Sequence, residues 1–156
     1  MSGYRIEPLA KHDRDGFSCG STPLDRYFRE QVTQDVRRRI ASCFVAISSS
    51  DEVAGFYTLA ATSLAFDRLA PERARKLPRY PVVPAVLLGR LAVASTHQGK
   101  QLGIALVADA LLRCTRSDIA AHVMVVDAKD AAAVRFYERL GFERLIDDRS
   151  RLVRPI

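Results

Sequence analysis

The chain has 156 residues, of which 48% are hydrophobic and 27% charged, a composition typical of one soluble domain with a single core. No apolar run approaches the roughly 20 residues of a membrane-spanning helix, and the N-terminus carries no apolar signal segment. We therefore expect one domain over residues 1–156, located in the cytoplasm and without a membrane partner. The net charge of +6 is suited to an encounter with polyanions, but the charge alone favours the simpler interpretation of a solvated basic surface.

The spacing of the cysteines and histidines limits which disulfides and metal sites the sequence predicts. The three cysteines are an odd number without CxxC spacing, and we expect reduced structural thiols at Cys19, Cys43 and Cys114. The three histidines form no HxxxH or HExxH pattern, so the sequence predicts no metal site.

The sequence of the N-terminal part predicts a strand, a helix and a hairpin. A short strand is expected over Tyr4–Leu9, and Thr22 suits the N-cap of a helix with Pro23 at its first position. Apolar side chains at every fourth position favour an amphipathic helix of about 16 residues; they are Leu24, Phe28, Val32 and Val36. Two segments rich in β-forming residues, Cys43–Ile47 and Val53–Phe66, then read as the arms of an antiparallel hairpin.

The middle of the chain breaks this regular pattern. Four prolines and many charges lie within Asp67–Pro84, and the only element predicted there is a short helix over Glu72–Leu77, started by Pro71. Long irregular segments of this kind are often functional.

The C-terminal half alternates strands with helices. The predicted elements are a strand over Val86–Val93, a helix over Gly103–Arg116, a strand over His122–Ala128, a helix over Asp130–Leu140, and strands over Phe142–Ile146 and Arg151–Val153. Gly141 suits the position just after the second of these helices. The order implies an α/β (α+β) fold with a mixed, twisted sheet and helices on both faces.

The turn from Gln98 to Gly103 joins an apolar strand to a helix. Backbone N–H groups in such a turn point outward at the positive end of the helix, where a pyrophosphate binds well. The same arrangement occurs in α/β proteins of many functions, so these residues alone leave the ligand open.

The helix predicted over Asp130–Leu140 carries a single tyrosine. Ala133, Phe136 and Leu140 share one helical face, and Tyr137 lies beside it. A half-buried core position is one interpretation of this tyrosine. A phenol near the open end of the sheet, where α/β folds usually bind ligands, is the other.

Taken together, these segments resemble the GCN5-related N-acetyltransferases (GNAT), whose fold has a mixed sheet of about six to seven strands. The family's turn reads (Arg or Gln)-x-x-Gly-x-(Gly or Ala); Gln98 and Gly103 match it, and Gln101 replaces the middle glycine. Gln101 supplies the same N–H but, unlike glycine, does not easily adopt a positive φ. The resemblance implies acetyl-CoA as co-substrate without a metal, with Tyr137 as general acid. The cofactor-binding residues that it implies are Leu91, Ala92, Val93, Gln98, Gly99, Lys100, Gln101, Leu102, Gly103, Ile104, Ala133 and Phe136.

The N-terminal half narrows the resemblance. Phe17-Ser-Cys-Gly20 followed by Leu24-Asp25, then Gly55-Phe-Tyr-Thr-Leu59 and Gly89-Arg-Leu-Ala-Val93, is similar to the GNAT toxins of type II toxin–antitoxin modules. These toxins acetylate the amino group of aminoacyl-tRNA and block translation. The resemblance implies a homodimer and a ribbon-helix-helix antitoxin.

An aminoacyl-tRNA substrate gives the basic clusters a role. The candidate phosphate contacts are Arg37, Arg38, Arg75, Lys76 and Arg90. Two alternatives stay open: a GNAT enzyme that acetylates a small-molecule amine or a protein N-terminus, and a GNAT-like binding module without catalysis.

Overall fold

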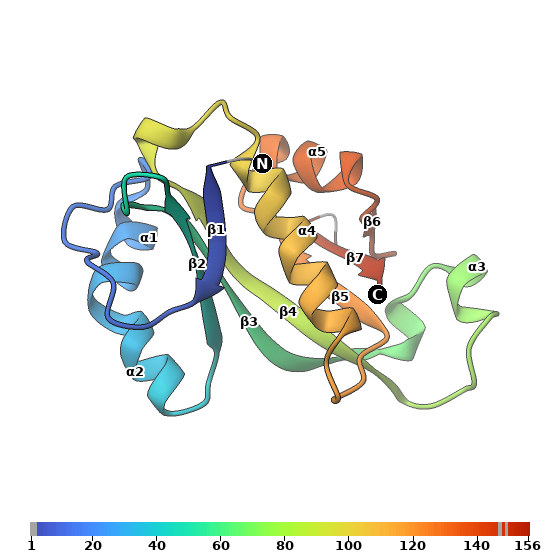
Figure 1. The fold of residues 1–156 in the computed structure, drawn as a ribbon. Helices are drawn as coiled ribbons and strands as arrows, with labels where there is room; N and C mark the ends of the chain where they lie inside the picture. Colours follow the sequence, from blue (N-terminus) through green and yellow to red (C-terminus); the bar gives the residue numbers. More distant parts are fainter. Residues whose placement is uncertain (1–2, 147, 149) are drawn as a thin grey trace. The chain divides into compact units, whose positions relative to one another are not determined.

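The computed structural model describes residues 3–146, 148 and 150–156. Seven strands hydrogen-bond in the order β1-β2-β3-β4-β5-β7-β6 (Figure 1). The strands are β1 (Tyr4–Pro8), β2 (Ser42–Ser48), β3 (Val53–Ala65), β4 (Val82–Val93), β5 (Val123–Asp127), β6 (Glu143–Arg144) and β7 (Arg151–Pro155). The β4–β5 pair is parallel, whereas β1–β2, β2–β3, β5–β7 and β6–β7 are antiparallel, so the predicted mixed sheet is confirmed.

Two compact units make up the chain. The first comprises Met1–Ala60 and Gly89–Leu112, and the second Ala61–Leu88 and Arg113–Ile156. The helices are α1 (Thr22–Arg26), the π-helix η1 (Tyr27–Gln31), α2 (Val32–Arg37), the 3-10 helix η2 (Phe66–Arg68), α3 (Pro71–Ala74), the 3-10 helix η3 (Ser95–His97), α4 (Leu102–Thr115) and α5 (Ala131–Arg139).

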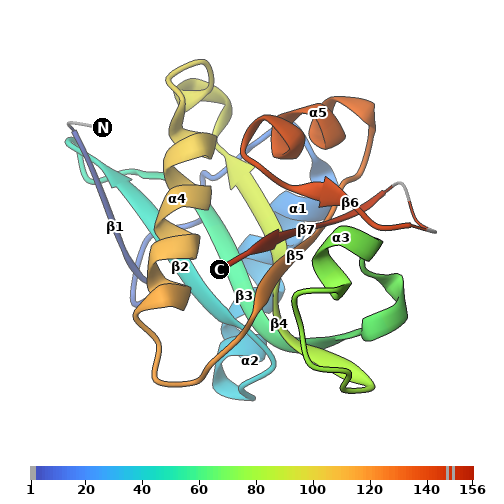
Figure 2. The same cartoon turned by 90° about the vertical axis from the view of Figure 1, so that its right-hand side faces the viewer.

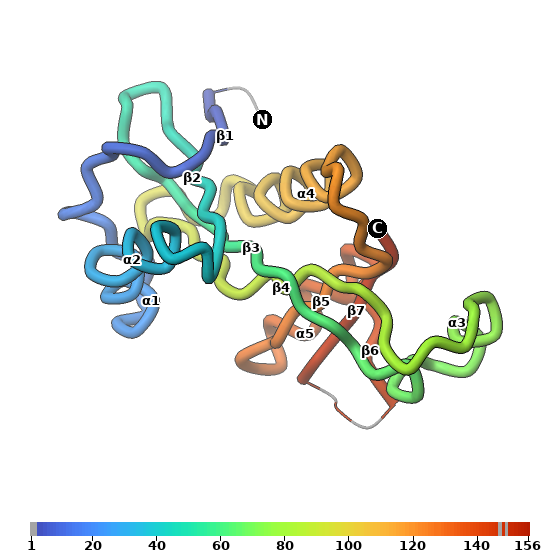
Figure 3. Tube along the Cα trace, turned by 90° about the horizontal axis from the view of Figure 1, so that it is seen from below, coloured from blue at the N-terminus to red at the C-terminus, as the bar shows by residue number. Residues whose placement is uncertain are grey.

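In the first unit, helices cover both faces of the strands. The ring of Phe28 stacks on that of Phe56 at 4.1 Å, which packs η1 against one face of β3. The neighbouring Tyr57 points to the opposite face because side chains alternate along a strand, and its hydroxyl donates to Asp109 of α4 at 2.6 Å. Figure 3 shows α1 and α2 on one side of these strands and α4 on the other.

The N-terminal helix differs from its prediction in two ways. Ser21, with an extended backbone, is the N-cap, and Thr22 is already helical. The helical path continues to Arg37 as expected, but η1 interrupts it with a π-turn. Such a turn weakens the regular backbone ladder, and Arg14 compensates by donating one Nη to the Phe28 carbonyl and the other to Thr33 Oγ1.

The second unit has its own core, to which side chains from β3, β4, β5 and β7 contribute. Figure 2 shows the ribbons of these strands. Strand β4 begins at Val82, not Val86, because Pro84 does not end it. The Pro84 carbonyl accepts the His122 N–H at 2.9 Å, a hydrogen bond that does not need the N–H that proline lacks.

Two further predictions in this unit were too long. The short helix is only Pro71–Ala74, and the strand after α5 is only Glu143–Arg144. Proline favours the first position of a helix and so determines where α3 begins, but it does not stabilise the following turns. The three cysteines are free thiols, as predicted.

Candidate active site

The turn between β4 and α4 is exposed and contains two left-handed residues. Gly99 has φ +79° and Gln101 has φ +62°. Gln101 therefore adopts the conformation that glycine reaches more easily, and a side chain in this conformation costs about 1–2 kcal/mol relative to an unstrained backbone. Leu102 is fully buried and anchors the start of the helix.

This turn fits a phosphate group. The first N–H groups of a helix have no intrahelical partner, and those of the long helix α4 follow directly on the exposed residues Gly99, Lys100 and Gln101. Gly103 adds no side chain at the second helical position.

Gln98 ties the end of β4 to a distant loop. Its Nε2 donates to the Val93 carbonyl at 3.0 Å and to the Cys19 carbonyl at 3.1 Å. Nearby, the Ser95 N–H donates to the Ser18 carbonyl at 2.8 Å. The first residue of the turn motif thus also has a structural role, which its spacing did not reveal.

The loop that carries Cys19 is held from the other side by the N-terminal helices. The Cys19 N–H donates to Asp25 Oδ1 at 2.9 Å, and Arg29 Nη1 donates to the Phe17 carbonyl at 2.6 Å. Asp25 is only 7% exposed, so its carboxylate is a buried anchor. The segments Phe17–Gly20 and Leu24-Asp25 therefore form one structural unit.

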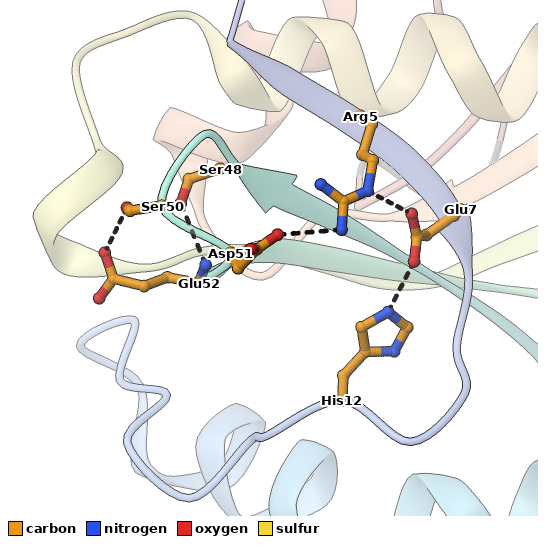
Figure 4. A network of polar contacts seen from close by, with 7 residues as sticks. All are labelled: Arg5, Glu7, His12, Ser48, Ser50, Asp51 and Glu52. Carbon is orange, nitrogen blue, oxygen red and sulfur yellow. Dashed lines mark hydrogen bonds and ion pairs between the residues drawn. The ribbon is translucent and has the colours of Figure 1, made fainter.

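A cleft of about 270 Å³ opens beside this loop. Its walls come from residues 13–18, 51–53 and 94–97, and they carry the carboxylates of Asp13, Asp51 and Glu52. Figure 4 shows the polar network behind one wall, in which Arg5 contacts Asp51 at 3.2 Å.

Glu7 is the centre of that network. It accepts hydrogen bonds from His12 at 2.8 Å and from Arg5 at 2.7 Å (Figure 4). The contact with His12, and then that with Arg5, lowers the pKa of the Glu7 carboxyl. The network fixes the turn between β2 and β3 that forms the cleft wall.

Tyr137 lies in the second unit, on α5. Asp130 caps this helix by accepting the Ala133 N–H at 2.8 Å. The Tyr137 ring packs edge-on against Phe136 and Phe142, with centroids 5.1 and 5.4 Å away. The residue is 8% exposed, and burial raises the pKa of its phenol to about 12. Within the described part of the chain, its hydroxyl has no hydrogen-bond partner.

The predicted site residues fall into both units. Leu91–Val93 and Gln98–Ile104 belong to the first unit, whereas Ala133, Phe136 and Tyr137 belong to the second. Ala133 and Phe136 are half-buried.

The predicted basic contacts are likewise divided. Arg37 and Arg38 are exposed at the end of α2 in the first unit, and Arg75 and Lys76 are exposed after α3 in the second. Arg90 is half-buried in β4, with its guanidinium carbon 3.6 Å from the centroid of the Tyr27 ring. Tyr27 is a residue that sequence reasoning missed, because the π-turn that orients it leaves no mark in the apolar spacing.

The described residues provide neither a metal site nor a membrane-spanning helix. No group of three or more His, Cys, Asp or Glu side chains there is placed to hold a metal ion. None of the helices that these residues form combines the length and apolar character needed to cross a lipid bilayer.

Comparison with known proteins identifies the family. The model of the acetyltransferase (GNAT) domain matches residues 39–144. The chain is 37% identical over 148 residues to a tRNA-acetylating toxin of Mycobacterium tuberculosis (strain ATCC 25618 / H37Rv), covering 92% of this chain and 87% of the relative.

Solved structures agree with this assignment. AtaT complexed with acetyl-methionyl-tRNAfMet superposes with a TM-score of 0.89 at 28% identity, covering 97% of this chain and 94% of that one. A Tyr-to-Phe mutant of the AtaT toxin, bound to the C-terminus of the antitoxin AtaR and acetyl-CoA, gives a TM-score of 0.82 at 26% identity, covering 98% and 93%. The chain belongs to the GNAT family of acetyltransferases, enzymes whose acetyl donor is acetyl-CoA.

Proposed function

We propose that this enzyme is a toxin that transfers the acetyl group of acetyl-CoA to the α-amino group of aminoacyl-tRNA, and so blocks translation. The observation that carries the proposal is 37% identity to a tRNA-acetylating toxin over 92% of the chain. The likeness to AtaT complexed with acetyl-methionyl-tRNAfMet supports the same acceptor. Because the family match runs through both compact units, we propose that they work as one catalytic domain.

The proposed binding site for the acetyl donor consists of the turn between β4 and α4 and of the end of β4. We propose that backbone N–H groups of Gln98–Ile104 hold the pyrophosphate of acetyl-CoA, and that Leu91–Val93 pair with its pantetheine arm. Ala133 and Phe136, both half-buried, would line the cofactor in the second unit. Acetyl-CoA supplies an activated thioester, and the chain's part is to orient that thioester and exclude water from it.

Tyr137 is the proposed general acid. With a pKa of about 12, its phenol keeps its proton throughout the physiological range and is available to the departing sulfur. The same pKa makes it a weaker acid than an ordinary phenol, whose pKa is about 10, so its hydrogen bond to the sulfur carries more of the effect than an early proton transfer does. A backbone N–H of β4 is the proposed donor to the thioester carbonyl, worth on the order of a few kcal/mol.

The acceptor amine needs little further activation. An α-amino group titrates at about 8, so a useful fraction is neutral near pH 7. Desolvation in the site raises that fraction, and orientation against the thioester supplies several kcal/mol more. We propose that no dedicated base is required.

Partners follow from the same proposal. Arg37, Arg38, Arg75, Lys76 and Arg90 are proposed to contact tRNA phosphates, which gives the reaction a salt-dependent KM. We also propose a homodimer, a cytoplasmic location and a ribbon-helix-helix antitoxin. The complex of AtaT with the C-terminus of AtaR supports an antitoxin partner.

The test is acetylation with labelled acetyl-CoA. Charged tRNA, the same tRNA without its amino acid, and a panel of small amines and peptide N-termini are offered separately. We expect label on charged tRNA only, retained by the amino acid after hydrolysis from the tRNA. Label on the small amines or peptides alone favours the alternative enzyme function, and failure to bind acetyl-CoA favours the non-catalytic module.

A further inference from the structure

Arg90 is fixed at both its backbone and its side chain. Its N–H donates to the hydroxyl of the buried Thr58 at 3.1 Å. Its guanidinium carbon lies 3.6 Å from the centroid of the Tyr27 ring, which is the geometry of a close cation–π stack. A long side chain that is normally free to rotate is therefore held in one place.

This guanidinium has no acidic partner within the described residues, whose other arginines include several that are paired. Arg5, Arg73, Arg144 and Arg151 each contact a carboxylate at 3.2 Å or less. Stacking covers a face of the guanidinium but leaves the N–H donors along its edge available. A planar fork of free donors, held in a fixed orientation, matches the oxygens of a phosphate.

Tyr27 is in turn held by its own contacts. It is 6% exposed, and its hydroxyl donates to Asp35 Oδ2 at 2.8 Å. It lies at the start of the π-turn η1, where Arg14 compensates the disturbed backbone by donating to the Phe28 carbonyl. The surrounding structure thus orients the ring before any ligand arrives.

The face of β4 indicates which substrate Arg90 serves. Ala92 packs in the same core cluster as Tyr27 and Phe28, and Arg90, two residues earlier, projects from the same face. The proposed pyrophosphate turn leads instead into α4, which covers the opposite face through Tyr57 and Asp109. Arg90 and the helix that follows the proposed pyrophosphate turn thus belong to opposite faces of the strands, which favours an anion other than that pyrophosphate as the partner of Arg90.

We infer that Tyr27 is a positioning residue that holds Arg90 as a preformed fork for one phosphodiester of the acceptor tRNA. The inference rests on the proposed function, because it needs a polyanionic acceptor. It distinguishes Arg90 from Arg37 and Arg38, whose exposed side chains have no aromatic platform among the described contacts.

The experiment measures kcat and KM for charged tRNA across a salt series, together with the Kd for acetyl-CoA. The variants are Arg90→Ala, Tyr27→Leu, Tyr27→Phe and the double variant Arg90→Ala/Tyr27→Leu. Arg26→Ala is the matched control. Arg26 is an exposed arginine that directly precedes Tyr27 in the chain, and, unlike Arg90, it has a carboxylate partner, Glu30, at 3.8 Å.

We expect Arg90→Ala to raise KM for charged tRNA about tenfold with little change in kcat, the loss of a charge-assisted hydrogen bond. The slope of log KM against log salt should fall by about 0.7 to 0.9, the contribution of one phosphate. Tyr27→Leu should raise KM severalfold, and the double variant should be no worse than Arg90→Ala alone. Tyr27→Phe keeps the ring and should stay close to the unmodified enzyme. The acetyl-CoA Kd should not change.

Three outcomes overturn the inference alone: an unchanged salt slope in Arg90→Ala, additive effects in the double variant, or a weakened acetyl-CoA Kd. The slope is decisive because a general loss of folding does not alter it, and Arg90→Ala removes no core side chain. An unmodified enzyme that acetylates no charged tRNA overturns the proposed function itself, and the inference with it.

Discussion

The carboxylate of Asp25 accepts a hydrogen bond from the backbone N–H of Cys19, with 2.9 Å between Oδ1 and N. This contact joins two short segments that are separate in the sequence, Phe17–Gly20 and Leu24-Asp25. It fixes the loop that also accepts the side-chain amide of Gln98, and through Gln98 the end of β4. The position of the proposed donor strand thus depends on a buried carboxylate in the first helix.

Asp25→Ala should therefore lower the free energy of unfolding by about 1–3 kcal/mol, because it leaves a part-buried N–H without its acceptor. Asp25→Asn retains an oxygen at the same position and should lose less. Urea denaturation measures both, with Asp15→Ala as a control at an exposed position. Equal losses for the Ala and Asn variants would contradict this role of the carboxylate oxygen.

Gly55 sets the distance between β3 and α4. A Cβ at this position would lie 2.9 Å from the Ala92 carbonyl oxygen and 3.1 Å from Leu106 Cδ1. Since the first neighbour is backbone, Gly55→Ala should cost about 1–3 kcal/mol of stability. Gly16→Ala, where a Cβ meets nothing within 4 Å, is the matched control in thermal and urea denaturation. A Gly55→Ala protein as stable as the control would show that the β4 backbone at Ala92 and α4 both move away without cost.

Much of the fold was predictable because local pattern fixes it. The helix from Thr22 to Arg37, the hairpin, and α4 and α5 agree with their predictions within one or two residues. Amphipathic spacing and end signals such as Pro23 and Asp130 carry that information. The π-turn η1 was not predictable in this way, since it keeps apolar residues at every fourth position and shows itself only in backbone geometry.

The site was less predictable, because its contacts join distant residues. Gln98 and Cys19 are 79 residues apart in the sequence, and Arg90 and Tyr27 are 63 residues apart. Spacing identified the turn at Gln98–Gly103 as a phosphate-binding candidate. It did not reveal that Gln98 anchors a loop, or that Gln101 takes the left-handed conformation usually reserved for glycine.

Stability should fall at alkaline pH. Burial raises the pKa of the Cys43 thiol from 9.0, and that of the Tyr137 phenol from 10.0, to about 12 in each case. Both groups are neutral when protonated, so the folded state keeps their protons at a pH where the unfolded chain has lost them. Their contribution is fully present below pH 9, and each loses about 1.4 kcal/mol per pH unit between the unfolded and folded pKa values.

Urea midpoints between pH 8 and 11.5 measure this loss. Cys43→Ala and Tyr137→Phe should each make the decline shallower, whereas Cys114→Ala, at a less buried thiol, should change it less. If neither Cys43→Ala nor Tyr137→Phe alters the decline in stability, other titrating groups cause it.

Gln101 offers a position where a substitution should relieve strain. Its φ of +62° is easily reached by glycine and is poorly tolerated by β-branched residues. Gln101→Gly should keep or raise stability by up to about 1 kcal/mol, after the greater freedom of glycine in the unfolded chain is counted, and Gln101→Val should lower it by about 1–2 kcal/mol. The same pair at Lys100, which is exposed and has no positive φ, should not show this order. The affinity for acetyl-CoA, measured by calorimetry, should rank the Gln101 variants in the same order. The opposite order would contradict the proposal that this turn binds the cofactor.

Tyr137→Phe removes the proposed acid and keeps the ring that packs against Phe136 and Phe142. We expect a nearly unchanged Kd for acetyl-CoA and a rate of acetyl transfer at least tenfold lower in single-turnover kinetics, because a hydrogen bond to the departing sulfur is made only in the transition state. Tyr80→Phe is the matched control, since Tyr80 is 66% exposed. With a pKa of about 12, Tyr137 should cause no loss of rate below pH 10, so the rate should rise with pH as the α-amino group loses its proton and then stay level. Two results would show that Tyr137 is not the general acid. One is a Tyr137→Phe enzyme as fast as the control, and the other is a rate that begins to decline with rising pH before pH 10 only when Tyr137 is present.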